Sequence, residues 1–209
     1  MINEYNILIS SVGGQGGITL ARVLSITALS QGLKVRVGET LGMAQRGGSV
    51  QSHVRFGESV YGPFVPYGKS DVLLSLEPSE ALRSTQYIGK KTKIIMNIVP
   101  ILPMSVLLKE VIFPETDDIV ERLSGIVSAI YAIDAVELAK NAGPVECMNM
   151  VILGAYMSLG EPILTISAVK ESIARTVPSR FIKPNIKALD MGMHKMKELM
   201  KRRKQKSEI

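Results

Sequence analysis

Two glycine-rich segments near the N-terminus, each following a short apolar run, are the feature that most constrains the fold of this chain. Ser11–Gly17 follows Ile7–Ile9 and precedes an apolar stretch that starts at Ile18, and Gly42–Ser49 follows Lys34–Val37. Glycine permits positive φ and lets a ligand approach the backbone closely. A helix N-terminus adds free N–H groups that suit a phosphate or carboxylate. The pattern therefore indicates an α/β sheet that presents both loops to a ligand.

The first loop matches the dinucleotide fingerprint G-x-G-x-x-G only in part. Its first glycine is replaced by Ser11, whereas Glu39 falls where that fingerprint has an acidic residue, about twenty positions further on. A tight turn between strand and helix and a ligand cradle both remain open as interpretations. The candidate ligand contacts in this loop are Gly13, Gly14, Gln15, Gly16 and Gly17.

The second loop is more informative because it contains an isolated cation. Arg46 lies among flexible neighbours in a segment with almost no other charge. Such an arginine can present its planar guanidinium group to a carboxylate or phosphate. The alternative is a solvated or internally paired side chain. The candidate ligand contacts in this loop are Gln45, Arg46, Gly47, Gly48 and Ser49.

Apolar runs and helical periodicities alternate along the rest of the chain. Residues 50–56 alternate in polarity and predict a half-exposed strand, and residues 61–68 predict a surface loop. The other predicted strands are 5–11, 34–38, 71–76 and 92–99, and the predicted helices are 17–31, 78–87, 133–142, 148–158 and 165–176, the last with Thr165 as its cap.

The C-terminal part continues as a long helix. Ile186, Leu189, Met193, Met196 and Met200 recur at helical spacing and mark one apolar stripe, for which core packing is favoured and an adaptable Met-rich partner surface is the alternative. We therefore predict an α/β fold with a doubly wound, mostly parallel, Rossmann-like sheet and a helical C-terminal part. The chain is expected to form one domain over residues 1–209, in which 183–209 are a C-terminal helix and basic tail.

Composition narrows the class of protein. No apolar run reaches the length of a membrane span, and the N-terminus lacks a signal-peptide pattern, so a cytoplasmic protein without membrane contact is expected. The single cysteine, Cys147, cannot form an internal disulfide or hold a 4Fe–4S cluster, which needs about four thiolates. Because Cys147 lies beside Met148 and Met150, we expect it to pack in the core.

The net charge of +6 is concentrated at the C-terminus, where residues 195–206 hold seven lysines and arginines. A basic tail can indicate nucleic-acid or membrane binding. The rest of the chain has no basic stripe, and aromatic residues make up only 5% of the sequence. A solvated helix end is therefore the favoured interpretation, and we expect no nucleic-acid partner.

The sequence lacks the common motifs that would indicate catalysis by this chain alone. The sequence has no thiamine diphosphate motif, nucleophile elbow, HExxH or GKS/T loop. His53 and His194 are far apart in sequence and have no obvious carboxylate companion, so structural or solvent-facing roles are expected. The chain alone is expected to be inactive, and we assign no catalytic residue and no metal ligand.

Four segments carry a resemblance to a known family: Ser11–Gly17, Gly42–Arg55, Asp71–Pro78 and Asn149–Ala155. Together they resemble the gamma-type module of the 2-oxoacid:ferredoxin oxidoreductases, over roughly residues 5–195. Within that family the chain is most similar to the beta subunits of the indolepyruvate branch, which acts on aryl 2-oxoacids. Ser11 departs from the pattern, because a glycine is expected there.

The resemblance implies a subunit of an enzyme that oxidatively decarboxylates aryl 2-oxoacids such as indolepyruvate to aryl acyl-CoA and reduces ferredoxin. It implies that thiamine diphosphate and 4Fe–4S clusters lie on a large alpha subunit, that this chain alone binds no cofactor, and that CoA is a co-substrate near the glycine loops. A hetero-oligomer that meets ferredoxin through the complex is expected, with a homodimer possible in isolation. The stripe Met193–Met200 and the segment Tyr61–Tyr67 are the candidate partner surfaces.

Two alternatives remain open from sequence. One is the gamma subunit of a pyruvate or 2-oxoisovalerate ferredoxin oxidoreductase, because the missing subunit can determine the substrate. The other is a free-standing regulatory module that binds a dinucleotide at Gly13–Gly17.

Overall fold

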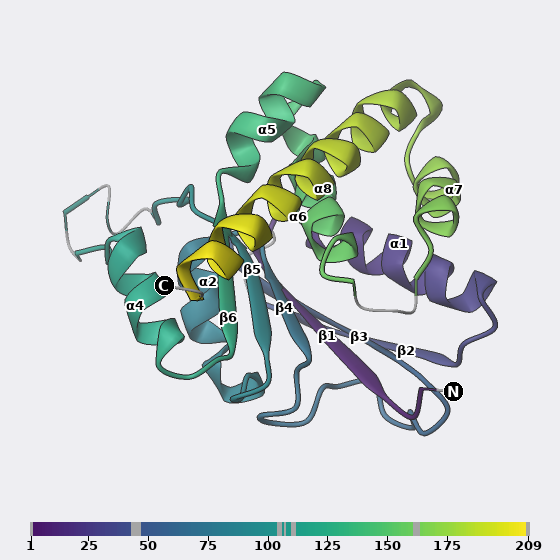
Figure 1. Cartoon of the computed structure of the whole chain (residues 1–209), viewed down its shortest axis with the longest axis horizontal. Coiled ribbons are helices and arrows are strands. Elements are labelled where there is room, and N and C mark those ends of the chain that lie inside the picture. The colour runs from purple at the N-terminus through teal and green to yellow at the C-terminus, as the bar shows by residue number, and fades with distance from the viewer. Residues whose placement is uncertain are drawn as a thin grey trace.

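A computed structural model describes residues 2–42, 47–103, 106, 108–109, 112–160 and 164–207. In this part of the chain six strands form one sheet, in the order β2-β3-β1-β4-β5-β6 (Figure 1). The strands are β1 (Tyr5–Val12), β2 (Val35–Leu41), β3 (Ser49–Phe56), β4 (Val72–Ser75), β5 (Lys93–Asn97) and β6 (Ala129–Ile133).

Strand direction brings the two glycine loops together. β1, β4, β5 and β6 are parallel neighbours, whereas β3 is antiparallel to both β1 and β2. The carboxyl ends of β1 and β2 therefore lie at the same edge as the start of β3. Val12 pairs with Ser49, and Leu41 pairs with Val50. Both loops begin at this edge, where α/β sheets usually bind ligands.

Helices cover both faces of the sheet, which confirms the predicted doubly wound α/β architecture. On one face, Ile7, Ile9 and Leu74 pack in a core with α1, α5, α6, α7 and α8. On the other face, Leu8 and Leu73 pack against α2 and α4. The helices are α1 (Gly17–Ser30), α2 (Pro78–Arg83), α4 (Thr116–Ser124), α5 (Ala135–Ala142), α6 (Met148–Met157), α7 (Ile166–Thr176) and α8 (Ser179–Ser207), with 3-10 turns η1 (Thr85–Tyr87) and η2 (Val145–Cys147).

The prediction that residues 50–56 form a half-exposed strand is wrong, because β3 is buried on both faces from Val50 onward. Its polar side chains lie beneath the segment that follows it. Arg55 donates hydrogen bonds to the carbonyls of Gly62 (2.7 Å) and Phe64 (3.1 Å). The Val65 N–H donates to His53 Nδ1 at 3.2 Å. An irregular segment thus covers this part of the sheet, which polarity alternation does not reveal.

Two elements differ from the sequence-based prediction. α4 lies where no regular structure was predicted, and β6 occupies the point where a helix was predicted to begin. α4 buries only Ile119 and Leu123, too few positions to establish a helical period. β6 is five residues long and ends at Ile133, where a helix was expected to begin. α5 instead begins after Asp134, whose side chain accepts a hydrogen bond from the Glu137 N–H at 2.8 Å.

α6 and α8 approach until their backbones touch. A Cβ atom at Gly192 would lie 2.8 Å from the Val151 carbonyl carbon, and one at Gly154 would lie 2.8 Å from the Leu189 carbonyl carbon. In α8, Met193 and Met196 are buried against this core. Core packing, the favoured interpretation of the stripe Met193–Met200, is therefore confirmed at these two positions, and the alternative of a partner surface is wrong there.

Candidate functional site

The β1–α1 loop closes as a tight turn that glycine makes possible. The Gln15 N–H donates to the Val12 carbonyl at 3.1 Å, and Gly14 and Gly16 have φ of 105° and 81°. These are left-handed conformations that favour glycine. Asn149 on α6 donates to the Gly16 carbonyl at 3.0 Å and occupies the space that a side chain at position 16 would need. Glycine is therefore required at position 16 by both backbone conformation and packing.

The two predicted loops are hydrogen-bonded to each other. The Gly13 N–H donates to the Gly48 carbonyl at 2.8 Å, and the Gly47 N–H donates to the Gly13 carbonyl at 3.4 Å. The Gly42 N–H donates to the Ser49 carbonyl at 2.8 Å, next to the β2–β3 ladder. The described ends of the second loop are thus fixed against the first loop.

A cavity of about 530 Å³ opens at these loops. α1 starts at its wall, and no side chain caps that helix end among the described residues. The free N–H groups of a first helical turn can bind an anion. Apart from Ser11, the lining side chains are apolar, and none of the described ones carries a charge. The lining residues are Ser11, Val12, Gly13, Gly14, Gly16, Gly17, Ile18, Leu41, Gly42 and Val50.

Two of the predicted contact residues use their side chains to hold the loops. Gln15 Oε1 accepts from the Val12 N–H at 2.8 Å, and its Nε2 donates to the Leu76 carbonyl at 2.9 Å, beyond the end of β4. The Ser49 hydroxyl donates to the Glu80 carboxylate on α2. Gln45 and Arg46 lie outside the described residues.

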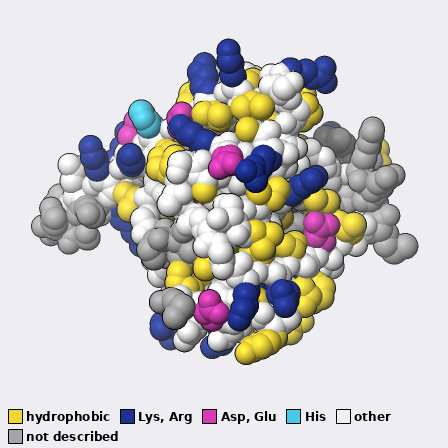
Figure 2. Space-filling model, turned by 90° about the vertical axis from the view of Figure 1, so that its right-hand side faces the viewer, with side chains coloured by type: hydrophobic (Ala, Val, Ile, Leu, Met, Phe, Trp, Pro, Cys, Tyr) yellow, Lys and Arg dark blue, Asp and Glu magenta, His cyan; other side chains and the backbone are white. Residues whose placement is uncertain are grey.

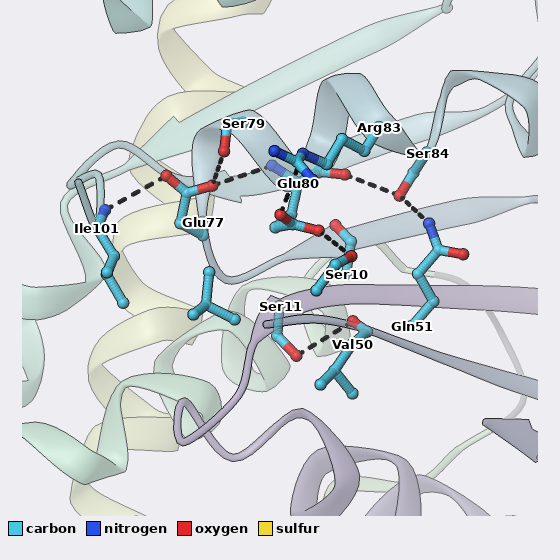
Figure 3. A network of polar contacts seen from close by, with 12 residues as sticks. Ser10, Ser11, Val50, Gln51, Glu77, Ser79, Glu80, Arg83, Ser84 and Ile101 are labelled. Carbon is cyan, nitrogen blue, oxygen red and sulfur yellow. Dashed lines mark hydrogen bonds and ion pairs between the residues drawn. The ribbon is translucent and has the colours of Figure 1, made fainter. Parts of the chain in front are cut away.

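The Ser49 contact belongs to a buried polar network around the start of α2, which the sequence analysis missed (Figure 3). Glu77 caps α2 by accepting the Glu80 N–H at 3.0 Å and also accepts the Ile101 N–H at 3.3 Å. Glu80 pairs with Arg83 at 3.4 Å. Burial raises the pKa of the Glu80 carboxyl, while the Ser49 hydrogen bond opposes that rise. A glutamate before a proline-initiated helix was the available sequence signal.

Ser11 and Glu39 bear on the dinucleotide alternative. The Ser11 hydroxyl lies against Gly17 and donates to the Val50 carbonyl at 3.4 Å, so serine is accommodated within the turn. Glu39 pairs with Ser52 on β3, and Ser52 in turn pairs with Ile9 on β1. Because a whole strand separates Glu39 from β1, its sequence spacing no longer supports ribose recognition beside the first loop.

The remaining reactive side chains are dispersed. His53 is buried, and burial with the Arg55 charge lowers its pKa to about 4. Burial also raises the pKa of the Cys147 thiol, and His194 is exposed on α8. Across the described ranges, no cluster of three or more His, Cys, Asp or Glu side chains could hold a metal ion. None of the described helices combines the length and apolarity needed to cross a membrane.

Comparison with known proteins assigns the family. The model of the pyruvate ferredoxin/flavodoxin oxidoreductase family matches residues 6–195. The chain belongs to this family. It is 43% identical to the indolepyruvate oxidoreductase subunit IorB of Pyrococcus horikoshii, over 95% of this chain and 99% of that protein. The IorB subunit of Methanothermobacter thermautotrophicus is 34% identical, over 90% of this chain and 96% of that protein. The resemblance found in the sequence is thereby confirmed.

Solved structures of lower identity share the fold. The gamma subunit of a keto/oxoacid ferredoxin oxidoreductase from Geobacter sulfurreducens matches 92% of this chain and 98% of that chain, with a TM-score of 0.67 and 22% identity. The 2-oxoglutarate:ferredoxin oxidoreductase of Magnetococcus marinus, whose structure contains 2-oxoglutarate, coenzyme A and succinyl-CoA, matches with a TM-score of 0.70 and 21% identity. That match covers 95% of this chain but 32% of the other. In that enzyme the same fold is one part of a longer polypeptide.

Proposed function

We propose that this chain is the small subunit of an indolepyruvate:ferredoxin oxidoreductase. With a larger subunit, it would convert aryl 2-oxoacids and CoA to aryl acyl-CoA and carbon dioxide while ferredoxin is reduced. The observation that carries the proposal is the similarity to IorB subunits, which reaches 43% identity and extends over 95% of the chain. Membership of the family indicates an oxidoreductase subunit, and the preference for aryl 2-oxoacids is our proposal.

We assign thiamine diphosphate and the iron–sulfur clusters to the larger subunit. A 4Fe–4S cluster requires about four thiolates, and this chain has one cysteine. Thiamine diphosphate supplies the electron sink for decarboxylation, and the sequence has no recognisable motif that would bind it. We propose that this chain contributes to substrate binding and that the larger subunit carries out the redox chemistry.

The cavity at the glycine loops is our candidate site for an anionic group of CoA. The end of α1 and the backbone of Gly13–Gly17 supply positive potential without charged side chains. Val12, Ile18 and Leu41 supply apolar wall for the rest of an elongated molecule. Arg46 lies in sequence between Gly42, which lines the cavity, and Gly47, which bonds to Gly13. We therefore propose that Arg46 contributes the charge that the described lining lacks.

Reconstitution with the larger subunit tests the proposal. The complex is expected to reduce a viologen dye only when CoA and an aryl 2-oxoacid are both present, and either subunit alone is expected to be inactive. Indolepyruvate, pyruvate and 2-oxoisovalerate should be compared at equal concentration. A preference for pyruvate or 2-oxoisovalerate would assign the complex to another branch of the family. Stabilisation of the isolated chain by NAD, with none by CoA, would instead favour the dinucleotide-binding module.

Replacement of Arg46 tests the role of the second loop. Arg46→Ala is expected to raise the KM for CoA or for the oxoacid by roughly 10- to 150-fold, the range for one charge-assisted hydrogen bond. Arg46→Lys keeps the charge but loses the planar two-point contact, so partial loss is expected. Arg122→Ala, at an exposed position on α4, is the matched control. Unchanged KM values for both substrates would show that Arg46 contacts neither.

A further inference from the structure

The two edges of the sheet differ in how well they are protected. β6 has five residues, and the Arg203 guanidinium on α8 donates to the carbonyl of neighbouring Ser128 at 2.8 Å. β2 has seven residues and contains no proline or lysine, and its charged residues are Arg36 and Glu39. Within the described part of the chain, β2 pairs only with β3. Long unprotected edge strands invite pairing with another chain.

The hydrogen-bond register shows which backbone groups of β2 point outward. The Gly42 N–H donates to the Ser49 carbonyl, and the Gly57 N–H donates to the Lys34 carbonyl at 3.0 Å. Even-numbered residues therefore bond toward β3. Because directions alternate along an antiparallel ladder, the N–H and C=O groups of Val37 and Glu39 face away from the sheet. These groups are available to an incoming strand.

An aromatic groove of about 480 Å³ lies beside this edge. The Phe64 ring packs on β2, 3.0 Å from where a Cβ atom at Gly38 would be. Tyr67 is 72% exposed, and Phe64 is 52% exposed. No charged side chain lines the groove, whose residues are Thr40, Phe64, Val65, Pro66, Tyr67 and Tyr87. Figure 2, which looks onto the side of the molecule where β2 lies, shows several small hydrophobic patches between charged side chains on that side.

The exposed apolar area is large for a surface without a partner. Phe64 and Tyr67 on one face of this edge and Val37 and Leu41 on the other together expose on the order of 400 Å², taking roughly 150–250 Å² for a whole large side chain. This is about half of the ~800 Å² that each partner contributes to a stable interface. The backbone of β2 and the rim of the cavity can supply the remainder. The nearby charges are balanced, because Lys34 pairs with Glu58 at 3.2 Å and β2 itself carries one cation, Arg36, and one anion, Glu39.

We propose that an uncharged, extended segment of the larger subunit pairs with the free edge of β2 and places alternate side chains in the aromatic groove. This inference rests on the proposed function, which supplies the larger subunit. Named relatives are subunits, and in the Magnetococcus enzyme this fold is continuous with about twice as much additional chain. Leu41 belongs to β2 and also lines the 530 Å³ cavity. A strand docked on β2 therefore reaches the cavity and completes its wall.

Proline substitution tests the backbone contact. Val37→Pro removes an outward N–H, which proline tolerates on an edge strand, whereas Val37→Ala removes the side chain and keeps the N–H. Loss of one interfacial hydrogen bond is expected to weaken binding to the larger subunit about tenfold in Val37→Pro. Val37→Ala is expected to weaken binding to the larger subunit by a smaller factor. Glu39→Pro, with Glu39→Gln as its control, repeats the comparison at the next outward position. Equal circular dichroism and melting temperature of the free variants establish that they fold.

Side-chain substitution and hydrogen exchange provide independent readouts. Tyr67→Ser is expected to weaken the complex, whereas Tyr61→Ser is not, because Tyr61 is 84% exposed but does not line the groove. The Val37 and Glu39 amides are expected to exchange rapidly in the free chain and slowly in the complex. A merely structural role for these residues predicts no such difference.

Three outcomes overturn the inference. The first applies if the wild-type complex forms. If both proline variants then bind the larger subunit as strongly as the wild type, and the Val37 amide still exchanges rapidly in the complex, the partner docks elsewhere. If the isolated chain is a dimer that Val37→Pro dissociates, and the hetero-complex is unaffected, the strand that pairs with β2 comes from a second copy. If the wild-type chain forms no complex with the larger subunit, the proposed function fails, and the assigned occupant fails with it.

Discussion

The glycine contact between α6 and α8 leads to a quantitative prediction for Gly192→Ala. The new Cβ atom would overlap the Val151 carbonyl oxygen and lie 2.8 Å from the Val151 carbonyl carbon, whereas ordinary contacts begin at 3.4 Å. α6 is buried at nine of its ten positions, so it has little room to move away. Overpacking costs about 1–3 kcal/mol, and contact with rigid backbone favours the upper end. Because alanine has a higher helix propensity than glycine, the substitution also stabilises the folded chain by up to about 1 kcal/mol. We expect a net loss of about 2 kcal/mol.

Differential scanning calorimetry checks this value. For a chain of this size, a loss of about 2 kcal/mol lowers the melting temperature by roughly 4–8 °C. Gly125→Ala is the matched control, because Gly125 has a φ of −71° and the nearest atom to its new Cβ would be 3.8 Å away. This control is expected to leave the melting temperature unchanged or slightly raised. A Gly192→Ala variant that melts at or above the wild-type temperature would refute the close helix contact.

Two further predictions concern buried ionisable groups. His53 has a pKa of about 4 in the folded chain against 6.5 for the free side chain, so the unfolded chain takes up the proton first, and stability is lost as pH falls from about 6.5 toward 4. His53→Gln is therefore expected to narrow the difference between urea midpoints at pH 7 and pH 5, and an unchanged difference would contradict the assignment. Ser49→Ala removes the donor to Glu80, which further raises the pKa of that carboxyl. It is expected to cost about 1–3 kcal/mol in urea unfolding, whereas the exposed control Ser124→Ala costs little. Equal losses in these two serine variants would show that the Ser49 contact contributes nothing.

The sequence correctly predicted those elements whose conformation depends on residues only a few positions apart. The apolar run before Gly13 and the glycines of the turn identify β1 and the start of α1, because burial and positive φ constrain those positions directly. Thr165 was predicted as a cap, and its hydroxyl accepts the Ala168 N–H at 3.3 Å. Such contacts join residues a few positions apart, so the sequence alone displays both partners.

Long-range contacts explain most of what the sequence analysis missed. The insertion of β3 between β1 and β2 depends on pairing between distant segments, and no local pattern records strand order. Gln15 and Ser49 were correctly located beside the loops. Their side-chain partners, the Leu76 carbonyl and Glu80, lie 61 and 31 residues further along the chain. From sequence alone, backbone contacts could therefore not be separated from side chains that hold the loops in place, and ligand binding at these loops stays a prediction.

The hydrogen bonds between Gly13, Gly47 and Gly48 affect how quickly a ligand can bind. These bonds, with the Gln15 contacts, fix the amide directions at the cavity floor before a ligand arrives. The conformational entropy of that floor is therefore lost during folding and not during binding. If the cavity binds an anionic group of CoA as proposed, that ligand loses mainly its own conformational freedom when it enters. Its association with the floor is expected to follow the rate of encounter, since this part of the site does not have to rearrange first.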